Sequence, residues 1–401
     1  MTAQPPPGPL ADLRVLDLSR VLAGPYCAMM LGDMGASVIK VEQPGSGDDT
    51  RRWGPPFAEG ESAYFLAVNR NKRSITLNIK EPRGQEILQQ LVARSDVLIE
   101  NFKHGTLEHL GFGYDALHAQ YPKLIYCSIS GYGADGPYAN RPGYDIAAQA
   151  MGGLMSLTGA PDGDPMKAGL PLADLTTGLF ACSAVLGALH HCDRTGLGQR
   201  VDLSLLESIV ALLVNVATGH MMTGAAPERF GNAHPNLVPY QLFETRDGSL
   251  IAGAGNDRQF ADLCAVLDLP ELGSDHRFQT NADRVMHRTE LIPLLQSAFL
   301  QRDSAAWTQR LLQAGVMAAP ILGVDQVLND PQVLHRQMRM TLPHSTIGDL
   351  QVPGIPYKLN ESPASGRTAP PLLGQHTDEI LSRELGLDDA QITALRAGGV
   401  I

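Results

Sequence analysis

The first 130 residues alternate between short apolar runs with strand character and segments with helical spacing, and this alternation constrains the fold more than any other feature. A strand, a turn through Gly24-Pro25, a helix and a second strand follow one another between residues 14 and 42. The pattern then repeats, with expected strands at residues 14–18, 37–42, 74–79, 96–100 and 124–129 and expected helices at residues 26–34, 84–94 and 114–120. Strands separated by helices indicate parallel βαβ units, so we expect an α/β fold built on a doubly wound sheet.

The character of the sequence changes after Gly231. A chain of 401 residues is too long for one simple core, so a second domain is expected. Residues 231–334 begin with an expected β-hairpin and continue with helical segments, which predicts a smaller α+β domain. We place the end of the large domain at residue 205, after an expected helix at residues 176–191, and interpret residues 206–230 as a linker with helical character from residue 203.

Charge and cysteine content exclude several functional classes. The net charge of −11 argues against general binding to nucleic acids or membrane surfaces. The five cysteines are odd in number and form no C-x-x-C pair, which is typical of a reduced, cytoplasmic protein.

His190, His191 and Cys192 are adjacent, but no second ligand pair follows, so we expect no metal site. The longest apolar stretch, Ile209 to Ala217, is too short to span a bilayer, and we expect a soluble protein.

Residues 131–136 form a literal G-x-G-x-x-G directly after an expected strand. A dinucleotide fingerprint requires a helix to begin at the last glycine, so that its N-terminus meets the pyrophosphate. Pro137, Pro142 and Gly143 follow instead, and the acidic residue expected about 20 positions later is missing. A shaped loop is therefore the better interpretation. Neither G-x-x-x-x-G-K-[ST] nor G-x-S-x-G occurs, which argues against P-loop and serine-hydrolase functions.

The basic segment at residues 69–73 and the residue Asp174 each allow two interpretations. The segment Asn69-Arg70-Asn71-Lys72-Arg73 is strongly basic within an acidic protein, which fits either phosphate recognition or a solvated turn. Asp174 precedes a long, largely apolar helix, where a carboxylate is either a helix N-cap or a nucleophile. From the residues alone, the N-cap is the simpler interpretation, because a cap contributes about 1 kcal/mol without any further requirement.

An ordered set of segments resembles the class III coenzyme A (CoA) transferases, the family of formyl-CoA transferase also called CaiB/BaiF. The match runs from about Leu10 to Ile401 through Asp17-Leu18-Ser19-Arg20-Val21-Leu22-Ala23-Gly24-Pro25, Gly32 to Ala36, Val38 to Glu42, Asn71 to Ser74, Glu100-Asn101-Phe102, Ala173-Asp174-Leu175, Thr195 to Gln199 and Leu373 to Thr377. Each segment alone is modest, but their order along the chain is specific.

The resemblance implies a Rossmann-like large domain completed by residues 335–401, a smaller middle domain, and two ring-like subunits interlocked as a homodimer. It implies that CoA is a substrate held along the loops of the first domain. The residues it assigns to the thioester end are Arg20, Val21, Leu22 and Ala23. The residues it assigns to the nucleotide and pantetheine are Lys72, Arg73, Asn101, Phe102 and Arg141, which favours the functional interpretation of the basic segment.

Asp174 matches the catalytic aspartate of this family, so the resemblance implies that its carboxylate attacks an acyl-CoA thioester. Covalent catalysis then proceeds through an anhydride and an aspartyl-CoA thioester. The main alternative is a 2-methylacyl-CoA racemase, in which a His precedes the Asp-Ile dipeptide after the glycine-rich loop. Tyr144 occupies that position here. Tyrosine has a pKa of about 10 and is therefore a poor base for α-proton exchange. CoA transfer is accordingly favoured over racemisation.

The segment Gly231 to Asn236, followed by Val238-Pro239-Tyr240-Gln241, departs from the glycine run of formyl-CoA transferases. It resembles the branch that acts on dicarboxylic acids such as glutarate, often with succinyl-CoA as donor. That branch implies that His234 and Asn236 meet the distal carboxylate of a substrate, with Tyr144 in the same site. The alternative is that the two polar side chains only order their loop.

Overall fold

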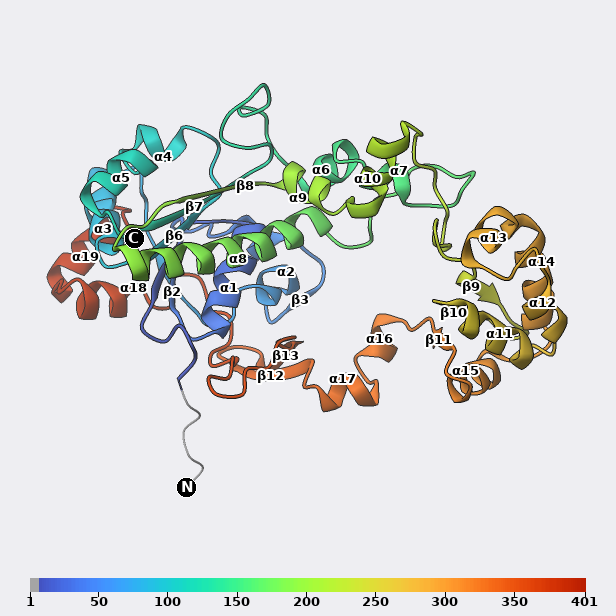
Figure 1. Cartoon of the computed structure of the whole chain (residues 1–401). Helices are drawn as coiled ribbons and strands as arrows, with labels where there is room; N and C mark the ends of the chain where they lie inside the picture. The colour runs from blue at the N-terminus through green and yellow to red at the C-terminus, as the bar shows by residue number, and fades with distance from the viewer. Residues whose placement is uncertain (1–6) are drawn as a thin grey trace. The chain divides into compact units, whose positions relative to one another are not determined.

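The computed structural model describes residues 7–401 (Figure 1). Unit 1 combines the chain up to Leu154 with Lys167–Met221 and Pro331–Ile401, and unit 2 combines Met155–Met166 with Met222–Asp330. Unit 1 resumes at Pro331 rather than at residue 335, and the units differ from the sequence-based boundaries in two further places. Residues 155–166 belong with unit 2, and the expected linker instead contains the helices α9 (Leu205–Ala211) and α10 (Val214–Thr223), most of which belong to unit 1.

Unit 1 is built on a six-stranded parallel sheet with the order β5-β2-β1-β6-β7-β8. The strands are β1 (Arg14–Asp17), β2 (Ser37–Glu42), β5 (Lys72–Thr76), β6 (Val97–Glu100), β7 (Ile125–Ser130) and β8 (Arg200–Ser204). The order reverses between β1 and β6, and loops that leave such a reversal point in opposite directions form a crevice at the carboxyl edge. The expected doubly wound sheet is confirmed, with β8 as an additional strand where a helix was expected from Leu203.

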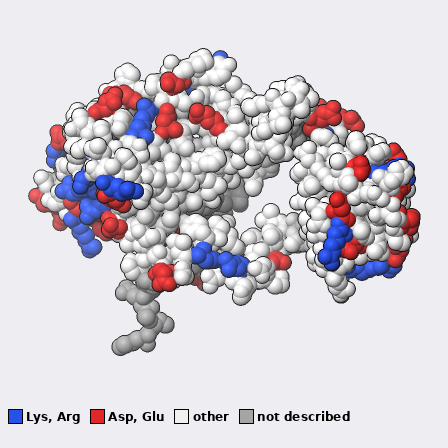
Figure 2. Space-filling model, in the orientation of Figure 1, with Lys and Arg blue, Asp and Glu red and all other residues white. Residues whose placement is uncertain are grey.

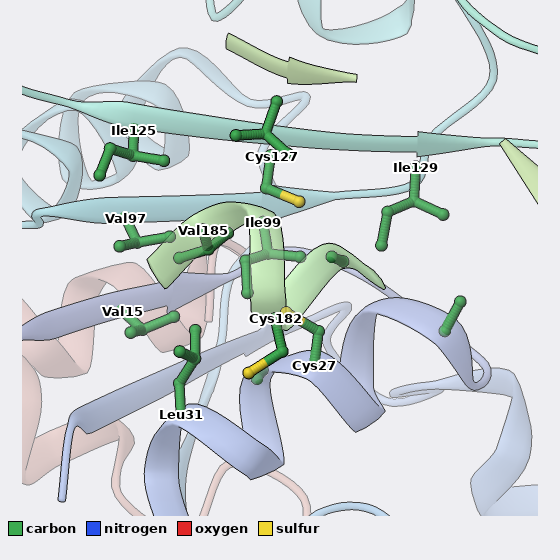
Figure 3. Close-up of a cluster of buried hydrophobic side chains, with 14 of the residues drawn as sticks. Val15, Cys27, Leu31, Val97, Ile99, Ile125, Cys127, Ile129, Cys182 and Val185 are labelled. Atoms are coloured by element: carbon green, nitrogen blue, oxygen red, sulfur yellow. The ribbon is translucent and has the colours of Figure 1, made fainter. Parts of the chain in front are cut away.

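Helices cover both faces of this sheet (Figure 1). On one face, α1 (Ala23–Asp33) and α8 (Leu172–Thr195) pack on a core that includes Cys27, Cys127 and Cys182 (Figure 3). On the other face lie α3 (Pro82–Val92), α5 (Tyr114–Gln120) and α19 (Asp389–Ala397). Helix α3 is amphipathic, since its apolar residues recur with helical spacing and are the ones that are buried. The five cysteines are all free thiols, and Cys192 is the one that is only partly buried.

Helix α8 is longer than the apolar stretch singled out in the sequence. By length and hydropathy alone it meets the requirement for a membrane span, although only half of its most apolar window is buried within the protein. The buried half faces the sheet and α1 through Ala181, Cys182, Val185 and Ala188. The composition of α8 is therefore accounted for on this side by core packing.

The C-terminal region completes unit 1. Asp33 accepts hydrogen bonds from Arg70 and Asn71, and the Asn71 side chain holds the backbone of residues 365–368. Further along, the N–H of Asn78 donates to the carbonyl oxygen of Val400 at 2.7 Å. The remaining elements of this unit are η1 (Asp49–Arg52), β3 (Phe57–Ala58), β4 (Glu61–Ser62), α2 (Ala63–Ala67), α4 (Thr106–His109), α6 (Asp145–Met151), α17 (Pro331–His335), β12 (Arg339–His344), β13 (Gly348–Pro353), α18 (Thr377–Glu379) and η2 (Ile380–Glu384).

Unit 2 has its own core. Its antiparallel sheet has the order β11-β10-β9, and Phe243, Phe260, Phe299 and Trp307 are buried between this sheet and the helices. Phe243 and Phe299 stack with ring centroids 4.4 Å apart. The elements are β9 (Tyr240–Glu244), β10 (Ser249–Gly253), α11 (Asp257–Val266), α12 (Pro270–Ser274), α13 (Asn281–Met286), α14 (Arg288–Phe299), α15 (Ser304–Gln313), β11 (Met317–Pro320) and α16 (Val324–Val327), while α7 (Leu154–Leu157) lies at the boundary between the units.

Candidate active site

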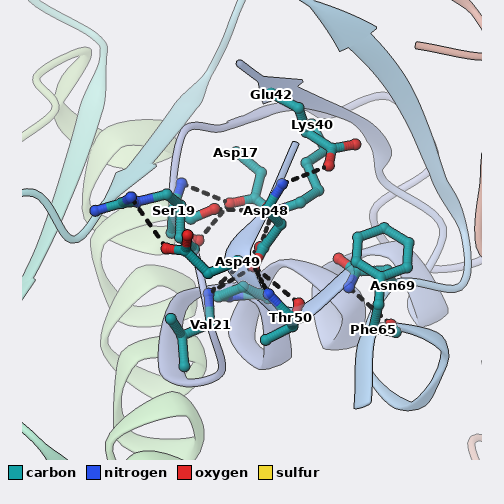
Figure 4. Close-up of polar contacts among 12 residues, drawn as sticks. Asp17, Ser19, Val21, Lys40, Glu42, Asp48, Asp49, Thr50, Phe65 and Asn69 are labelled. Carbon is teal, nitrogen blue, oxygen red and sulfur yellow. Dashed lines mark hydrogen bonds and ion pairs between the residues drawn. The ribbon is translucent and has the colours of Figure 1, made fainter. Parts of the chain in front are cut away.

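The loop between β1 and α1 is held in place from several directions (Figure 4). The N–H of Ser19 donates to Asp17 Oδ1 at 3.0 Å, and the carbonyl oxygen of Ser19 accepts from Lys40 Nζ at 2.8 Å. The N–H of Val21 lies 3.3 Å from both carboxylate oxygens of Asp48. Val21 has a φ of 70°, a left-handed conformation that is costly for a β-branched residue and persists only when its surroundings enforce it. The loop is therefore preorganised by buried polar side chains.

Two buried ion pairs support this loop. Lys40 Nζ lies 2.9 Å from Asp48, and Lys72 Nζ lies 2.9 Å from Asp17, with all four side chains inaccessible to solvent. Burial alone would raise the pKa of Asp48, but Lys40 and the hydrogen bonds from Thr50 lower it to about 2. Breaking either pair would leave an unpaired buried charge, which costs about 3–5 kcal/mol.

The structure corrects the sequence-based role of Lys72. Its ammonium group donates to Asp17, to the carbonyl oxygen of Pro25 and to Asn69, which uses all three of its donors. The residue is 1% exposed, and burial lowers its pKa to about 8. Lys72 therefore supports the loop from within and is not placed to contact a bound phosphate.

Arg73 is not placed for this role either. Its guanidinium group pairs with Glu384 at 2.5 Å and donates to Ser37 Oγ at 3.1 Å. Ser37 is the first residue of β2, so Arg73 lies towards the amino edge of the parallel sheet, opposite the edge where the loop from β1 to α1 begins. The basic segment at residues 69–73 is thus structural, because Arg70 is also buried in an ion pair with Asp33.

Asn101 links the loops that leave β1 and β6. Its side-chain oxygen accepts the N–H of Arg20 at 2.8 Å, and its amide nitrogen donates to the carbonyl oxygen of Arg20 at 2.7 Å. The guanidinium of Arg20 also lies 5.8 Å from the ring centroid of Phe102 and 3.2 Å from Asp49. The structure therefore brings together Arg20, Asn101 and Phe102, three of the residues selected from the sequence.

A pocket of about 390 Å³ opens at the carboxyl edge, where the strand order reverses. Its apolar lining comes from the ends of neighbouring strands and the residues after them, namely Leu18, Val41, Leu77, Ile79, Phe102 and Leu110. Its cationic lining comes from Arg20, Lys40, Arg52, Lys80 and Lys103. Within residues 7–401, Lys80 and Lys103 make no ion pair, in contrast to Lys72 and Arg73. Sequence reasoning missed these two lysines, although both lie in the segments that follow strand ends, Lys80 after β5 and Lys103 after β6.

Val21 and Leu22 pack with Tyr26, Tyr64 and Leu175. Leu175 is adjacent to Asp174, so the thioester-end residues selected from the sequence lie beside the first turn of α8. Ala23 begins α1 and is buried. A side chain at Gly24 would come within 2.3 Å of Ser19, which explains why glycine is needed where the loop folds back.

Asp174 is partly buried within the first turn of α8, where the N-cap position is occupied by Pro171 instead. The N-cap interpretation is therefore wrong. Burial, followed by the nearby charge of Asp145, raises the pKa of Asp174 to about 7. The Asp145 carboxylate accepts the N–H of Ala173 at 2.8 Å and that of Asp174 at 3.3 Å. Asp145 was not selected from the sequence, where only its neighbour Tyr144 was considered as a site residue.

Residues 131–143 form a closed loop rather than a dinucleotide fingerprint. Gly131 and Gly143 are in backbone contact, since a Cβ on Gly131 would lie 2.4 Å from the Cα of Gly143. The next helix, α6, begins only at Asp145. Arg141 stacks on Tyr138 at 3.7 Å within this loop and does not line the pocket. Tyr144 precedes α6 and is 67% exposed.

His234 and Asn236 belong to unit 2. The Nδ1 atom of His234 accepts the N–H groups of Asn236 at 3.0 Å and Leu237 at 3.1 Å. The ring of His234 also packs against Tyr240, with centroids 5.6 Å apart. The histidine therefore orders its loop, and its Nε2 atom is the nitrogen left for a ligand. Within residues 7–401, no group of His, Cys, Asp or Glu is arranged to hold a metal ion.

Comparison with known proteins decides the family. The model of CoA-transferase family III matches residues 10–377. The chain belongs to this family. Succinyl-CoA:glutarate CoA-transferase from Mus musculus is 47% identical over 98% of this chain and 90% of its own length. Succinate--glutarate CoA-transferase from Agrobacterium fabrum is 44% identical over 93% and 95%. The crystal structure of a CAIB/BAIF family protein from Brucella suis has a TM-score of 0.83 and 43% identity, covering 94% of this chain and 99% of that one.

The sequence-based resemblance and its enzymatic class are thereby confirmed: the protein is a CoA transferase. The racemase alternative is not favoured, because these curated relatives transfer CoA.

Proposed function

We propose that this CoA transferase moves CoA from a succinyl-CoA-like donor to a small dicarboxylic acid through an aspartyl-CoA thioester on Asp174. The substrate class is supported by the names of the relatives, which act on succinate or succinyl-CoA and glutarate. The route is supported by the placement of Asp174, a partly buried carboxylate beside the preorganised loop that carries Val21 and Leu22. The position of Asp174 is the observation that carries the proposal.

We place the nucleotide of CoA in the pocket at the carboxyl edge of the sheet. Lys80 and Lys103, which make no ion pair within residues 7–401, supply charge for phosphates, and Phe102 supplies an aromatic face for the adenine. Arg20 lines this pocket and belongs to the loop between β1 and α1, whose residues Val21 and Leu22 pack beside the first turn of α8. If pantetheine follows this loop, its thioester end reaches Asp174. Asn101 contributes by fixing Arg20, and Arg141 has no role in this placement.

The chemistry requires four exchanges at one carboxylate. An oxygen of Asp174 attacks the donor carbonyl carbon, the C–S bond breaks, and the electron pair leaves as CoA thiolate. The thiolate then attacks the aspartyl carbon, forming the Asp174 thioester and releasing the donor acid. The acceptor carboxylate repeats both exchanges in reverse. Each step exchanges one anionic leaving group for another, so no general base is needed.

From the resemblance to the relatives that act on dicarboxylic acids, His234 and Asn236 are proposed to recognise the distal carboxylate of the acceptor, and Tyr144 is proposed separately as a substrate contact. The Nε2 atom of His234 is available because Nδ1 is occupied within the loop.

We further propose that the protein is a cytoplasmic, interlocked homodimer that requires no metal. The free thiols support a reducing compartment, and the exposed apolar side chains of α6, α8 and α9 support association with a second copy.

The proposal is tested by mass spectrometry of protein incubated with succinyl-CoA and quenched with borohydride or hydroxylamine. Wild-type protein should carry a modification at Asp174, Asp174→Ala should carry none, and the control Asp193→Asn at the exposed far end of α8 should behave as wild type. Transfer to glutarate should exceed transfer to butyrate, which lacks the distal carboxylate. Rapid turnover without a modification on Asp174 would contradict the route, and equal use of both acids would contradict the substrate class.

A further inference from the structure

Both carboxylate oxygens of Asp145 accept hydrogen bonds, and one of them holds the first turn of α8. Oδ1 accepts the N–H groups of Ala173 at 2.8 Å and Asp174 at 3.3 Å, while Oδ2 accepts from Gln149 Nε2 at 2.7 Å. The first N–H groups of a helix have no partners within the helix. Asp145 therefore caps the start of α8 from another helix, α6, and fixes the backbone of the catalytic residue.

Gln149 extends this support. It lies one turn after Asp145 on α6 and is fully buried. Its Oε1 atom accepts the N–H of Ala168 at 2.9 Å, and its Nε2 atom also lies 3.4 Å from the carbonyl oxygen of Leu170. Helix α6 thus holds the chain at four residues between 168 and 174.

The arrangement also places two carboxylates side by side. Burial, followed by Asp145, raises the pKa of Asp174 to about 7. Tyr64 on α2 is affected by both carboxylates, since burial, then Asp174, Asp145 and Asp48, raise the pKa of Tyr64 to about 12. Asp174 makes no ion pair with any side chain in residues 7–401. The charged side chain that acts on Asp174, Asp145, therefore has the same sign as the Asp174 carboxylate.

We propose that Asp145 is a positioning residue whose negative charge favours the covalent states of Asp174 over the free carboxylate. When the Asp174 oxygen bonds to the acyl carbon, the C–S bond breaks and the negative charge leaves with the CoA sulfur. When the thiolate then forms the aspartyl thioester, the charge leaves with the donor acid. In both covalent states Asp174 is neutral, and the repulsion from Asp145 is relieved.

This inference rests on the proposed function, so the experiment separates the two. Asp145→Asn keeps an oxygen for the N–H groups of residues 173 and 174 but removes the charge, Asp145→Glu keeps the charge, and Asp193→Asn removes one charge at the far end of α8. The measurements are the pH dependence of kcat/KM and the fraction of Asp174 modified at equilibrium with succinyl-CoA.

We expect Asp145→Asn to move the acid limb of the pH profile down by about one unit and to lower the ratio of modified to free Asp174 by about tenfold. Asp145→Glu and Asp193→Asn should retain the wild-type acid limb. A wild-type protein that turns over without modification on Asp174 would overturn the proposed function itself. If the wild type is modified but Asp145→Asn matches Asp193→Asn in both measurements, the role of Asp145 is refuted. If Asp145→Asn does not fold, a downward shift in Asp145→Glu would refute it instead.

Discussion

Asp174, the proposed nucleophile, lies in surroundings that favour the protonated form of its carboxyl group. Because burial and Asp145 raise its pKa to about 7, the nucleophilic form is lost as the pH falls through neutrality. We predict that kcat/KM falls about tenfold for each pH unit below 7 and becomes level above pH 8. Steady-state rates between pH 5 and pH 9 measure this. A profile that stays level down to pH 5 would show that the carboxylate has an ordinary pKa.

The raised pKa of Asp174 also lowers the free energy of unfolding above neutral pH. A carboxyl group whose pKa is higher in the folded state than in the unfolded state contributes stability below the unfolded pKa, and this contribution is lost as the pH rises to about 7. Asp174→Asn should therefore raise the free energy of unfolding at pH 8 by about 2 kcal/mol, with solvent screening included, and have little effect near pH 4. Urea unfolding at both pH values tests this. Equal effects at both would contradict the prediction.

The direction in which single side chains point could not be predicted from the sequence. The motif containing Asp174 was found from its resemblance, but the basic residues expected to bind CoA were Lys72 and Arg73, whereas Lys80 and Lys103 line the pocket in which we propose that the nucleotide binds. Local sequence shows that all four are basic. Only the register of β5 decides that Lys72 points into a buried ion pair with Asp17, because a shift of one residue along a strand exchanges its faces.

At the scale of elements, the loop at residues 131–143 determines where α6 begins and thus where Asp145 meets α8. We predict that Gly131→Ala lowers kcat/KM by about 100-fold, because the new Cβ would lie 2.4 Å from the Cα of Gly143 and the two backbones must separate. As a control, Gly187→Ala adds a side chain on α8 where nothing lies within 4 Å. It should stabilise the protein by about 0.5–1 kcal/mol and leave kcat/KM unchanged. Similar kinetics for the two variants would contradict this account of the loop.

The elements themselves follow from the sequence to different extents. Five strands of the large sheet, β1, β2, β5, β6 and β7, were predicted from apolar runs and turn residues. The strand β8 was not, because Arg200, Asp202 and Ser204 alternate with only Val201 and Leu203. Its place at the edge of the sheet, paired with β7 alone, permits such a polar strand. The apolar runs therefore predicted the other five strands of this sheet and missed β8, its polar edge strand.

At the scale of the whole molecule, the sequence predicted a second domain but not how the chain divides. Residues 155–166 join unit 2 although they precede α8, and Pro331–Ile401 returns to unit 1 through contacts such as Asn71 with residues 365–368. These contacts join positions almost 300 residues apart, for example Asn71 and Arg367. Local patterns contain no signal for such pairs, so only the family resemblance indicated that both chain ends build the large domain.

The surface of unit 1 bears on the proposed dimer. Figure 2 shows few charged side chains from the middle of α8 towards α9. Exposed apolar side chains on the helices α6, α8 and α9, which pack together, include Ile146, Leu179, Phe180 and Val210. An apolar surface of this kind on a CoA transferase is expected to be covered by a second copy, since its exposure to water is unfavourable.

We predict that the wild type sediments as a dimer at micromolar concentration and that Phe180→Glu combined with Val210→Glu raises the dimer Kd at least about 100-fold, since two charges would be buried in an apolar interface. Leu312→Glu, which changes a similarly exposed apolar residue on α15 of unit 2, serves as the control and should remain dimeric. Sedimentation velocity across a concentration series distinguishes these outcomes. A monomeric wild type would refute the dimer, and a dimer unaffected by the double substitution would place its interface on another surface.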